Sequence, residues 1–269
     1  MKIIALILIT VFLSFYNPIF VYGVNTHSAD FERDTPSQYF SAADSTDNSV
    51  TGDISIELWF KREGPTAVKM GLVGKEGDAT GDWRSYELYF FTDDKIYFNY
   101  NDTGTPGNWT EEATDNNYST TGVWTHLAVT AVVATQDVNF YINGSAVAST
   151  LNSSAGSSIF DNNKTFEIGY YDQYFDGLID EVRVWSDVRT ATEISNNYQT
   201  TLNGNEANLV AYYMFDGSSL EDKGTGTDPA GAIADDLTNN NSVVFVTDVP
   251  FPVAAAAIIP QKSEIIIFE

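Results

Sequence analysis

The sequence predicts an all-β protein, folded as a two-sheet antiparallel β-sandwich with one short helix. Many short segments alternate apolar and polar residues, which is the pattern of half-buried strands. Gly, Asn, Asp or Pro bound each segment, and no helical patterns separate the segments as they would between parallel strands. The chain has 269 residues, of which 43% are hydrophobic and 14% aromatic, enough for one large β domain with a core.

The first 23 residues resemble a secretory signal peptide. Lys2 is followed by an apolar run over residues 3–15, and the segment ends in Val-Tyr-Gly, with small or apolar residues at the −3 and −1 positions. The run is too short for a stable membrane span. We therefore expect cleavage after Gly23, a secreted or surface-displayed mature protein without a membrane span, and a β-sandwich domain over residues 24–251.

The predicted strands follow one another along this domain. In residues 54–61, the apolar side chains of Ile54, Ile56, Leu58 and Phe60 share one face. Eight further segments show comparable patterns: 86–91, 95–99, 124–131, 138–142, 165–169, 178–185, 209–215 and 243–247.

Two kinds of connection are predicted between the strands. Asn143-Gly144 lies between two strand patterns and favours a two-residue type I′ hairpin, because both residues tolerate positive φ. Residues 101–121 and 217–241 lack periodicity and are rich in turn residues. We expect both segments to be long surface loops, which are often functional.

One helix is predicted after the strand at 178–185. Thr190 and Glu193 have the spacing of a capping box, in which each side chain bonds to the backbone of the other residue. Ile194 and Tyr198 then share a face. A helix of about two or three turns should cap the sandwich here.

Residues 252–269 form a C-terminal tail with two short apolar runs. Neither run is long enough to cross a membrane. The tail is either a disordered or read-through extension, or it contains a strand at 264–268 that pairs with the sheet edge of a neighbouring subunit.

The charge balance limits the possible partners. The chain has 13 basic and 37 acidic residues and a net charge of −24. Such a charge repels nucleic acid and anionic membranes and attracts divalent cations. The chain contains no cysteine, so its stability must come from the core and from any bound metal rather than from disulfides.

The segment 175–185, FDGLIDEVRVW, contains three acids: Asp176, Asp180 and Glu181. They could be a catalytic set, a metal site or a solvated strand edge. Strict alternation places Asp180 on the same face as Val182 and Val184, which should point into the core. A carboxylate there needs a cation or several donors. The same alternation places Glu181 and Arg183 on an opposite face that we expect to be solvated.

This segment and the following helix resemble the C-terminal signature of the concanavalin A-like lectin and glucanase superfamily, in its laminin G-like jelly-roll branch. Other segments resemble family motifs in the same order: SIELWFKR at 55–62, VWTHLAVT at 123–130, VNFYINGSAV at 138–147, NLVAYYMFDGSS at 208–219 and VTDVPF at 246–251. The resemblance covers residues 29–251 and implies a two-sheet jelly roll.

The resemblance also implies a bound Ca²⁺, held by the Asp of the Ile-Asp-Glu-Val motif, which is Asp180 here. Glu32 is the candidate partner, because Phe31-Glu32 lies where the family has Phe-Asp-Gly, although the glycine position is Arg33 in this chain. Asp216, in Phe-Asp-Gly, is a further candidate ligand; the alternative is that it is a turn residue.

The sequence argues against an enzyme. Retaining glucanases of the superfamily carry Glu-x-Asp-x-Glu or a one-residue-longer variant on one strand, and this chain has neither. His27 and His126 are the only histidines, and His126 matches a position that the family uses structurally. No motif of nucleophilic catalysis or phosphate binding is present.

Several aromatic residues are candidates for ligand binding, because sugar rings stack on aromatic faces while their hydroxyls need polar partners. Five lie in or beside loops rich in Asn and Asp: Trp109, Trp83, Tyr171, Tyr174 and Tyr118. The alternative is that each aromatic side chain only covers the rim of the sandwich.

We therefore expect a secreted, non-catalytic, calcium-stabilised β-sandwich that binds a glycan or glycoprotein. The alternative is a structural or adhesive extracellular subunit that self-assembles by strand addition into a homo-oligomer or filament.

Overall fold

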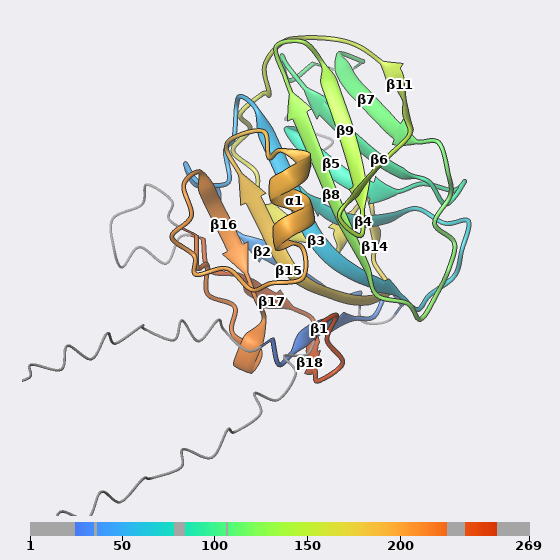
Figure 1. The fold of residues 1–269 in the computed structure, drawn as a ribbon, viewed down its shortest axis with the longest axis vertical. Coiled ribbons are helices and arrows are strands. Elements are labelled where there is room, and N and C mark those ends of the chain that lie inside the picture. Colours follow the sequence, from blue (N-terminus) through green and yellow to red (C-terminus); the bar gives the residue numbers. More distant parts are fainter. Residues whose placement is uncertain (1–24, 35–36, 78–83, 106, 225–234, 252–269) are drawn as a thin grey trace, which may run out of the picture.

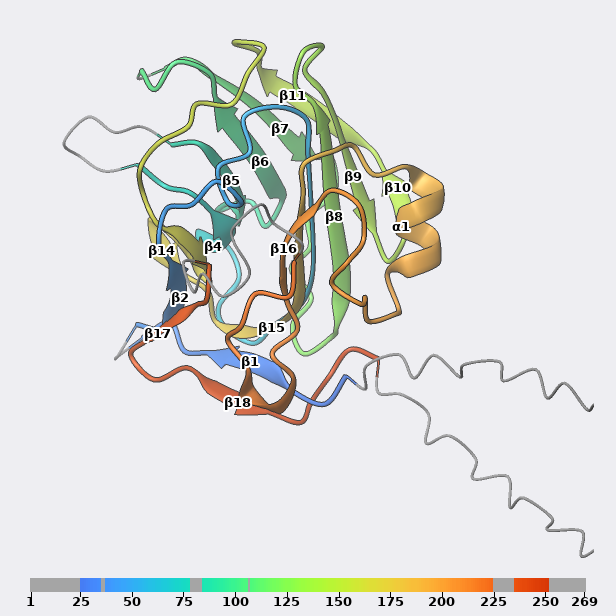
Figure 2. The same ribbon diagram turned by 90° about the vertical axis from the view of Figure 1, so that its left-hand side faces the viewer.

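The computed structural model describes residues 25–34, 37–77, 84–105, 107–224 and 235–251. Two antiparallel sheets face each other across the core, and the single α-helix of the described residues lies outside one of them (Figures 1 and 2). The predicted all-β sandwich with one short helix is confirmed. The predicted signal peptide, the tail at 252–269 and Trp83 lie outside the described residues.

The first sheet has eight described strands. Seven follow in the spatial order β10 (Ser145–Val147), β9 (Asp137–Ile142), β8 (Thr125–Val132), β3 (Ile54–Arg62), β15 (Gly177–Trp185), β1 (Ser28–Phe31) and β18 (Val244–Val246), and β16 (Leu209–Tyr213) also pairs with β15.

The second sheet also has eight described strands, and a small hairpin accompanies it. The spatial order is β11 (Ser149–Ser153), β7 (Trp109–Thr114), β6 (Ile96–Asn101), β5 (Tyr86–Phe90), β4 (Met70–Gly74), β12 (Phe166–Ile168), β2 (Tyr39–Ala42) and β17 (Thr238–Asn240). The hairpin consists of β13 (Tyr170–Tyr171) and β14 (Gln173–Tyr174).

The core lies between the two sheets and follows the predicted alternation. From β3 it takes Ile54, Ile56, Leu58 and Phe60, all buried. From the second sheet it takes aromatic and aliphatic side chains: Tyr86, Leu88, Phe90, Ile96, Phe98 and Tyr100. Burial of this apolar surface is the main source of stability in a domain without disulfides.

Helix α1 (Ala191–Asn197) begins with the predicted capping box, in which the Glu193 amide donates to Thr190 Oγ1 and the Thr190 amide donates to Glu193 Oε2. Ile194 packs against Ala128 and Tyr141 of the first sheet. The helix therefore covers the outer face of that sheet (Figure 2). The predicted hairpin is also confirmed, with positive φ at Asn143 and Gly144.

Two predicted loops contain regular structure. Residues 101–121 include β7, whose sequence WTEEAT lacks a clear apolar alternation. Residues 217–241 include part of a 3₁₀ turn, η1 (Asp216–Ser218), and β17. Both strands form hydrogen bonds with neighbouring strands, β7 with β6 and β17 with β2, so pairing rather than local pattern determines them. Among the described residues, no helix has the length and apolar character needed to cross a bilayer.

Candidate functional site

Strand β15 contains a β-bulge that changes the direction of its acids. Glu181 and Val182 together lie opposite the single residue Leu58, and Glu181 has a φ of 52°. Before the bulge, Asp180 pairs with Trp59, so both side chains belong to the outer face of the sheet. The predicted sharing of a face by Asp180 and Val182 is therefore wrong, because the extra residue shifts the alternation.

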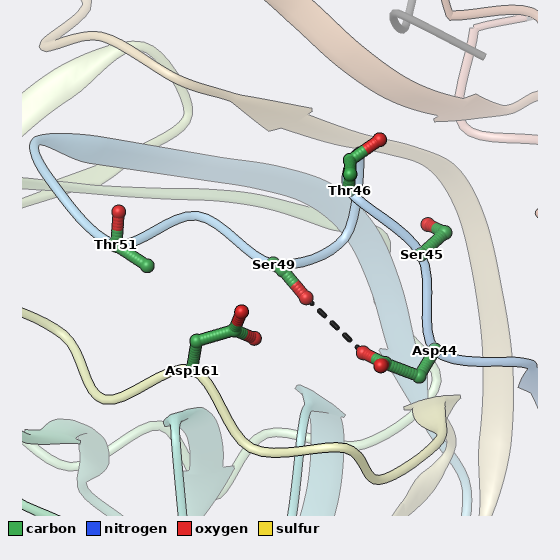
Figure 3. Close-up of a pocket in the computed structure, with 6 residues that line it drawn as sticks. All are labelled: Asp44, Ser45, Thr46, Ser49, Thr51 and Asp161. Carbon is green, nitrogen blue, oxygen red and sulfur yellow. Dashed lines mark hydrogen bonds between the residues drawn. The ribbon is translucent and has the colours of Figure 1, made fainter.

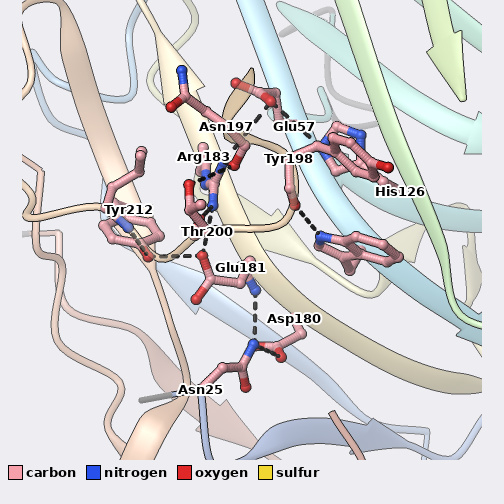
Figure 4. Close-up of polar contacts among 12 residues, drawn as sticks. Asn25, Glu57, His126, Asp180, Glu181, Arg183, Asn197, Tyr198, Thr200 and Tyr212 are labelled. Atoms are coloured by element: carbon pink, nitrogen blue, oxygen red, sulfur yellow. Dashed lines mark hydrogen bonds and ion pairs between the residues drawn. The ribbon is translucent and has the colours of Figure 1, made fainter. Parts of the chain in front are cut away.

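The outer face after the bulge is buried rather than solvated, which corrects the second expectation for this strand. Glu181 and Arg183 are both buried, and Arg183 Nη2 lies 2.8 Å from Glu181 Oε2 (Figure 4). Tyr212 donates to the same carboxylate at 2.7 Å, and the carbonyls of Asn197 and Thr200 accept from Arg183. Helix α1 and its following turn thus cover this ion pair.

Next to this pair, Glu57 joins the interior network. Trp185 Nε1 donates to Glu57 Oε1 at 2.9 Å, and His126 Nε2 lies 3.4 Å from Glu57 Oε2. Burial tends to raise the pKa of Glu57, but His126, Arg183 and Trp185 outweigh it and lower that pKa. Burial lowers the pKa of His126. The histidine is enclosed with a structural partner, in agreement with its expected structural role.

Asp180 is 0% exposed and has few partners for a buried carboxylate. Its Oδ2 accepts from Asn25 Nδ2 at 2.9 Å and its Oδ1 from the Glu181 amide at 2.8 Å. Burial, followed by the charge of Glu181, raises the pKa of Asp180 well above its usual value. A carboxylate in this position would gain from a nearby cation.

Asp216 lies close enough for its charge to raise the pKa of Asp180 further. Its Oδ1 accepts from the amide and hydroxyl of Thr26 and from the amide of His27, whereas its buried Oδ2 has no hydrogen-bond partner. Asn25 Oδ1 is also buried without a partner.

The oxygens of Asp180, Asn25 and Asp216 suit a hard cation such as Ca²⁺, and the two orphaned oxygens fit that group. Within the described residues, no three His, Cys, Asp or Glu side chains form a metal-binding cluster, so Asn25 and backbone carbonyls would have to complete the set. Asn25 precedes β1 and carries no sequence motif, which is why sequence reasoning missed it.

Glu32 lies elsewhere. It is exposed and follows the end of β1, where Phe31 pairs with Gly177. The same register places Asp180 near Ser28, four residues before Glu32, which at about 3.3 Å per residue is about 13 Å along the strand. The structure therefore brings Asp216, but not Glu32, to Asp180.

The outer face of the second sheet carries a polar row across three neighbouring strands. Glu87 of β5 pairs with Asn99 of β6, and Asn99 pairs with Glu111 of β7, so the three side chains share one face. The alternate residues, such as Leu88, point into the core. This outer polar row consists of Glu87, Asn99 and Glu111.

An aromatic strip runs beside the outer polar row. Tyr89 and Tyr97 stack with ring centroids 5.6 Å apart, and Phe91 packs edge-on against Tyr97 at 5.5 Å. At the other end, Tyr171 lies 4.4 Å from Tyr89. Phe91 is 39% exposed and Tyr97 is half-buried, so part of this strip is open to a ligand. We call Tyr171, Tyr89, Tyr97 and Phe91 the outer aromatic strip.

The two features contact each other through hydrogen bonds. Tyr89 donates its hydroxyl to Glu111 Oε2 at 3.1 Å, and Asn99 Nδ2 donates to the Tyr89 oxygen at 3.4 Å. Asn152 of β11 donates to Glu111 Oε1 at 3.4 Å. These contacts hold the Glu111 carboxylate beside the aromatic rings.

The hairpin β13–β14 closes one end of this face. It crosses β4 so closely that a Cβ added to Gly71 would lie 2.0 Å from the Tyr171 amide nitrogen, and only glycine fits there. Lys69 Nζ lies 4.1 Å from the centroid of the Tyr171 ring, and the Arg84 guanidinium lies 5.0 Å from it. These cation–π contacts help to hold the hairpin against the sheet.

Glu87 is the most enclosed acid of the outer polar row. It is 0% exposed, and Arg84 Nε lies 3.1 Å from its Oε1, but neither of its oxygens accepts a hydrogen bond. Burial raises the pKa of Glu87 well above its usual value, and Arg84 opposes this only partly. Asn99 is 3% exposed, and its Oδ1 likewise has no donor.

The structure separates the aromatic residues that the sequence singled out. Tyr171 and Tyr174 belong to the hairpin, and Trp109 begins β7 on the same outer face as Glu111. Tyr118 packs partly against the core and lines a pocket of about 210 Å³ at one end of the sandwich. The residues that sequence reasoning missed are Tyr89, Tyr97, Asn99 and Glu111. They could have been found as the residues that alternate with the core positions in the strands at 86–91 and 95–99 and in β7, and so lie on the outer face.

A separate polar pocket of about 470 Å³ opens beside the loop between β2 and β3 (Figure 3). Its lining consists of Asp44, Ser45, Thr46, Ser49, Thr51 and Asp161. The buried Lys75 ammonium bonds Asp44 at 2.5 Å and Ser49 at 2.7 Å and lies 3.7 Å from Asp161. This lining has hydroxyls and neutralised carboxylates but no aromatic surface, so the outer face of the second sheet is the better candidate for sugar binding.

Comparisons with known proteins agree with the fold. Residues 34–195 match the family model of the concanavalin A-like lectin/glucanases superfamily. A Bacteroides ovatus protein to which carbohydrate binding is ascribed has a similar fold, with a TM-score of 0.58 and 20% identity over 86% of this chain; the chain spans 62% of that protein's length. A heptameric SAP-like pentraxin from Limulus polyphemus gives a TM-score of 0.53 and 12% identity, covering 85% of this chain and 98% of the pentraxin. A search of curated sequences finds no significant match.

Proposed function

The chain belongs to the concanavalin A-like lectin/glucanases superfamily, and from this premise we propose that it is a secreted, non-catalytic, calcium-stabilised module that binds carbohydrate. The observation that carries the proposal is the outer face of the second sheet, where the outer aromatic strip lies beside the outer polar row. Carbohydrate binding is ascribed to the B. ovatus protein. Because that likeness concerns the fold, the proposal for this chain depends on its own side chains.

The chemistry of this face suits a sugar ring. The exposed ring of Phe91 and the half-buried ring of Tyr97 offer apolar surfaces to the C–H face of a pyranose or furanose. Glu111 is partly exposed and can accept hydrogen bonds from sugar hydroxyls, which are stronger when the acceptor is charged. Its bonds from Tyr89 and Asn152 orient the carboxylate before a ligand arrives.

The calcium part of the proposal concerns a different region, next to β15. Asp180, Asn25 Oδ1 and Asp216 Oδ2 would hold the ion, whose charge would neutralise the two acids. The segment before β1 already bonds to both acids through Asn25 and Thr26. These residues therefore tie the N-terminal segment to β15 and η1, and the expected role is stability rather than direct contact with the sugar.

The positions of the acids support a non-catalytic role. An inverting glycosidase needs two carboxyl groups about 6.5–9.5 Å apart with access to the substrate. Glu87 and Glu111 lie two strands apart, but Glu87 is 0% exposed and paired with Arg84, so it cannot reach a glycosidic oxygen. The alternative of self-assembly by strand addition depends on residues 264–268, which lie outside the described residues.

A polysaccharide panel tests the proposal. We expect the mature chain to bind at least one glycan, and Tyr97→Ala to weaken that binding at least about fivefold, since stacking on an aromatic ring contributes about 1 kcal/mol or more. Trp124→Ala is the matched control, because Trp124 is a half-buried aromatic residue of the first-sheet side. Equal losses in both variants, or binding by neither the wild type nor its variants, would contradict the assignment of this face.

A further inference from the structure

We infer that the outer face of the second sheet selects neutral glycans and rejects glycans that carry carboxylate or sulfate groups. This inference rests on the proposed function and specifies the ligand class of the same site. It follows from two properties of the face: its accessible acid, Glu111, accepts hydrogen bonds and has no cation beside it, and the cations at its hairpin end are already paired.

The acceptor of the outer polar row that a ligand can reach is Glu111, which is partly exposed. Glu87 is 0% exposed and ion-paired with Arg84, and Asn99 is 3% exposed. Glu111 accepts from Tyr89 and Asn152, both neutral, and among the described residues no Lys or Arg lies within ion-pair distance of it. A ligand that complements this row must therefore donate hydrogen bonds.

Sugar hydroxyls can donate, whereas ionised carboxylate and sulfate groups can only accept. An anionic group placed over Glu111 would bring acceptor against acceptor. Like charge beside Glu111 adds repulsion, which is stronger at a partly buried site than in water. A neutral sugar avoids both costs.

The two cations at the hairpin end of the face, Lys69 and Arg84, are already held in pairs. Lys69 Nζ lies 3.1 Å from Asp172 Oδ2, and Arg84 Nε lies 3.1 Å from Glu87 Oε1. Both side chains also contact the ring of Tyr171. An anionic group that binds at this end would have to break one of these pairs, and the net charge of −24 further lowers the local concentration of anionic sugars.

The test compares each neutral polysaccharide with its own charged derivative. Arabinan, xylan, mixed-linkage glucan and galactan are immobilised beside their carboxymethyl derivatives, and binding of the mature chain is measured at low and high salt. For every neutral polysaccharide that binds, we expect its carboxymethyl derivative to bind at least about tenfold more weakly in 50 mM salt. The ratio of the two dissociation constants should become smaller in 500 mM salt, because screening increases.

Glu111→Gln tests the residue that carries the inference. It keeps the size and one acceptor oxygen but removes the charge. The dissociation constant of the carboxymethyl derivative divided by that of its neutral parent should therefore become at least about threefold smaller than in the wild type. Asp137→Asn is the control, because it makes the same change in net charge on an exposed residue of β9 in the first sheet. That variant should keep the wild-type ratio.

The outcomes separate the two levels of the proposal. Binding of a carboxymethyl derivative as tight as that of its parent would overturn the selectivity while leaving glycan binding in place. If Asp137→Asn reduced the same ratio of dissociation constants as much as Glu111→Gln does, the effect would come from net charge, and the role of the face would be overturned. Failure to bind any member of the panel, neutral or charged, would contradict the proposed function itself.

Discussion

Replacing Asp180 by asparagine should abolish the stabilisation of the protein by calcium. Asp180 is 0% exposed, and burial raises the pKa of its carboxyl well above the usual value. Without a cation, the neutral amide removes the cost of a buried charge. Its new NH₂ group also has an acceptor within reach, because Asn25 Oδ1 has no donor and can face it after a flip of the Asn25 amide.

The magnitude follows from binding linkage. At a free calcium concentration of about 100 Kd, an ion that binds only the folded state stabilises it by about 2.7 kcal/mol. For a domain of this size, each kcal/mol shifts Tm by about 2–4 °C, so calcium should raise the Tm of the wild type by about 5–11 °C. Asp180→Asn should melt at or above the wild type in EDTA and show no calcium shift.

The assay is thermal unfolding followed by circular dichroism, in EDTA and in 1 mM calcium, for the wild type, Asp180→Asn and the exposed control Asp137→Asn. The control should keep the full shift. A wild type that melts at the same temperature in both buffers would refute calcium binding. A full shift retained by Asp180→Asn would refute Asp180 as a ligand while leaving an ion elsewhere.

Three further predictions concern the described residues. Arg183→Met leaves the buried Glu181 carboxylate without its cation and should cost about 3–5 kcal/mol in urea denaturation; a loss below about 1 kcal/mol would contradict the importance of this pair. Gly71→Ala places a Cβ 2.0 Å from the Tyr171 amide, and it should cost about 1–3 kcal/mol and weaken glycan binding, whereas unchanged stability would show that the hairpin can move away freely. Burial raises the pKa of Glu167 to about 7, so the folded state holds the proton of this carboxyl more tightly than the unfolded state does. The free energy of unfolding should therefore fall by about 1–2 kcal/mol, after allowance for partial exposure, as the pH rises from about 4.5 to about 8. Glu167→Gln should flatten that pH dependence when denaturation is measured at several pH values.

The sequence predicted half of the described strands, because each alternating segment buries one face and this pattern is local. The nine predicted segments correspond to nine strands, from β3 to β18. Most of the strands it missed are short or polar, such as β7, whose inward-facing positions are Thr110, Glu112 and Thr114 rather than apolar residues. Such strands are held by pairing with neighbours distant in sequence, and a local pattern carries no record of that pairing.

The same distinction explains the candidate site. The importance of Asp180 could be read from a carboxylate within an apolar strand, but its direction could not, because one extra residue at Glu181 changes the alternation without any signal in the residue types. Asn25 lies 155 residues before Asp180 in the chain, and only folding brings the two together.

By itself, the sequence determined the all-β class, the core-facing side of long regular strands such as β3, the Asn143-Gly144 turn and the capped helix, because each depends on residues within a few positions of one another. The tertiary structure alone decided which strands are neighbours and in what register. That register aligns Glu87, Asn99 and Glu111 from three strands into one row, and it places the hairpin with Tyr171 at the end of that row. Hydrogen-bonded pairing between distant segments sets these positions, and no local residue pattern encodes it.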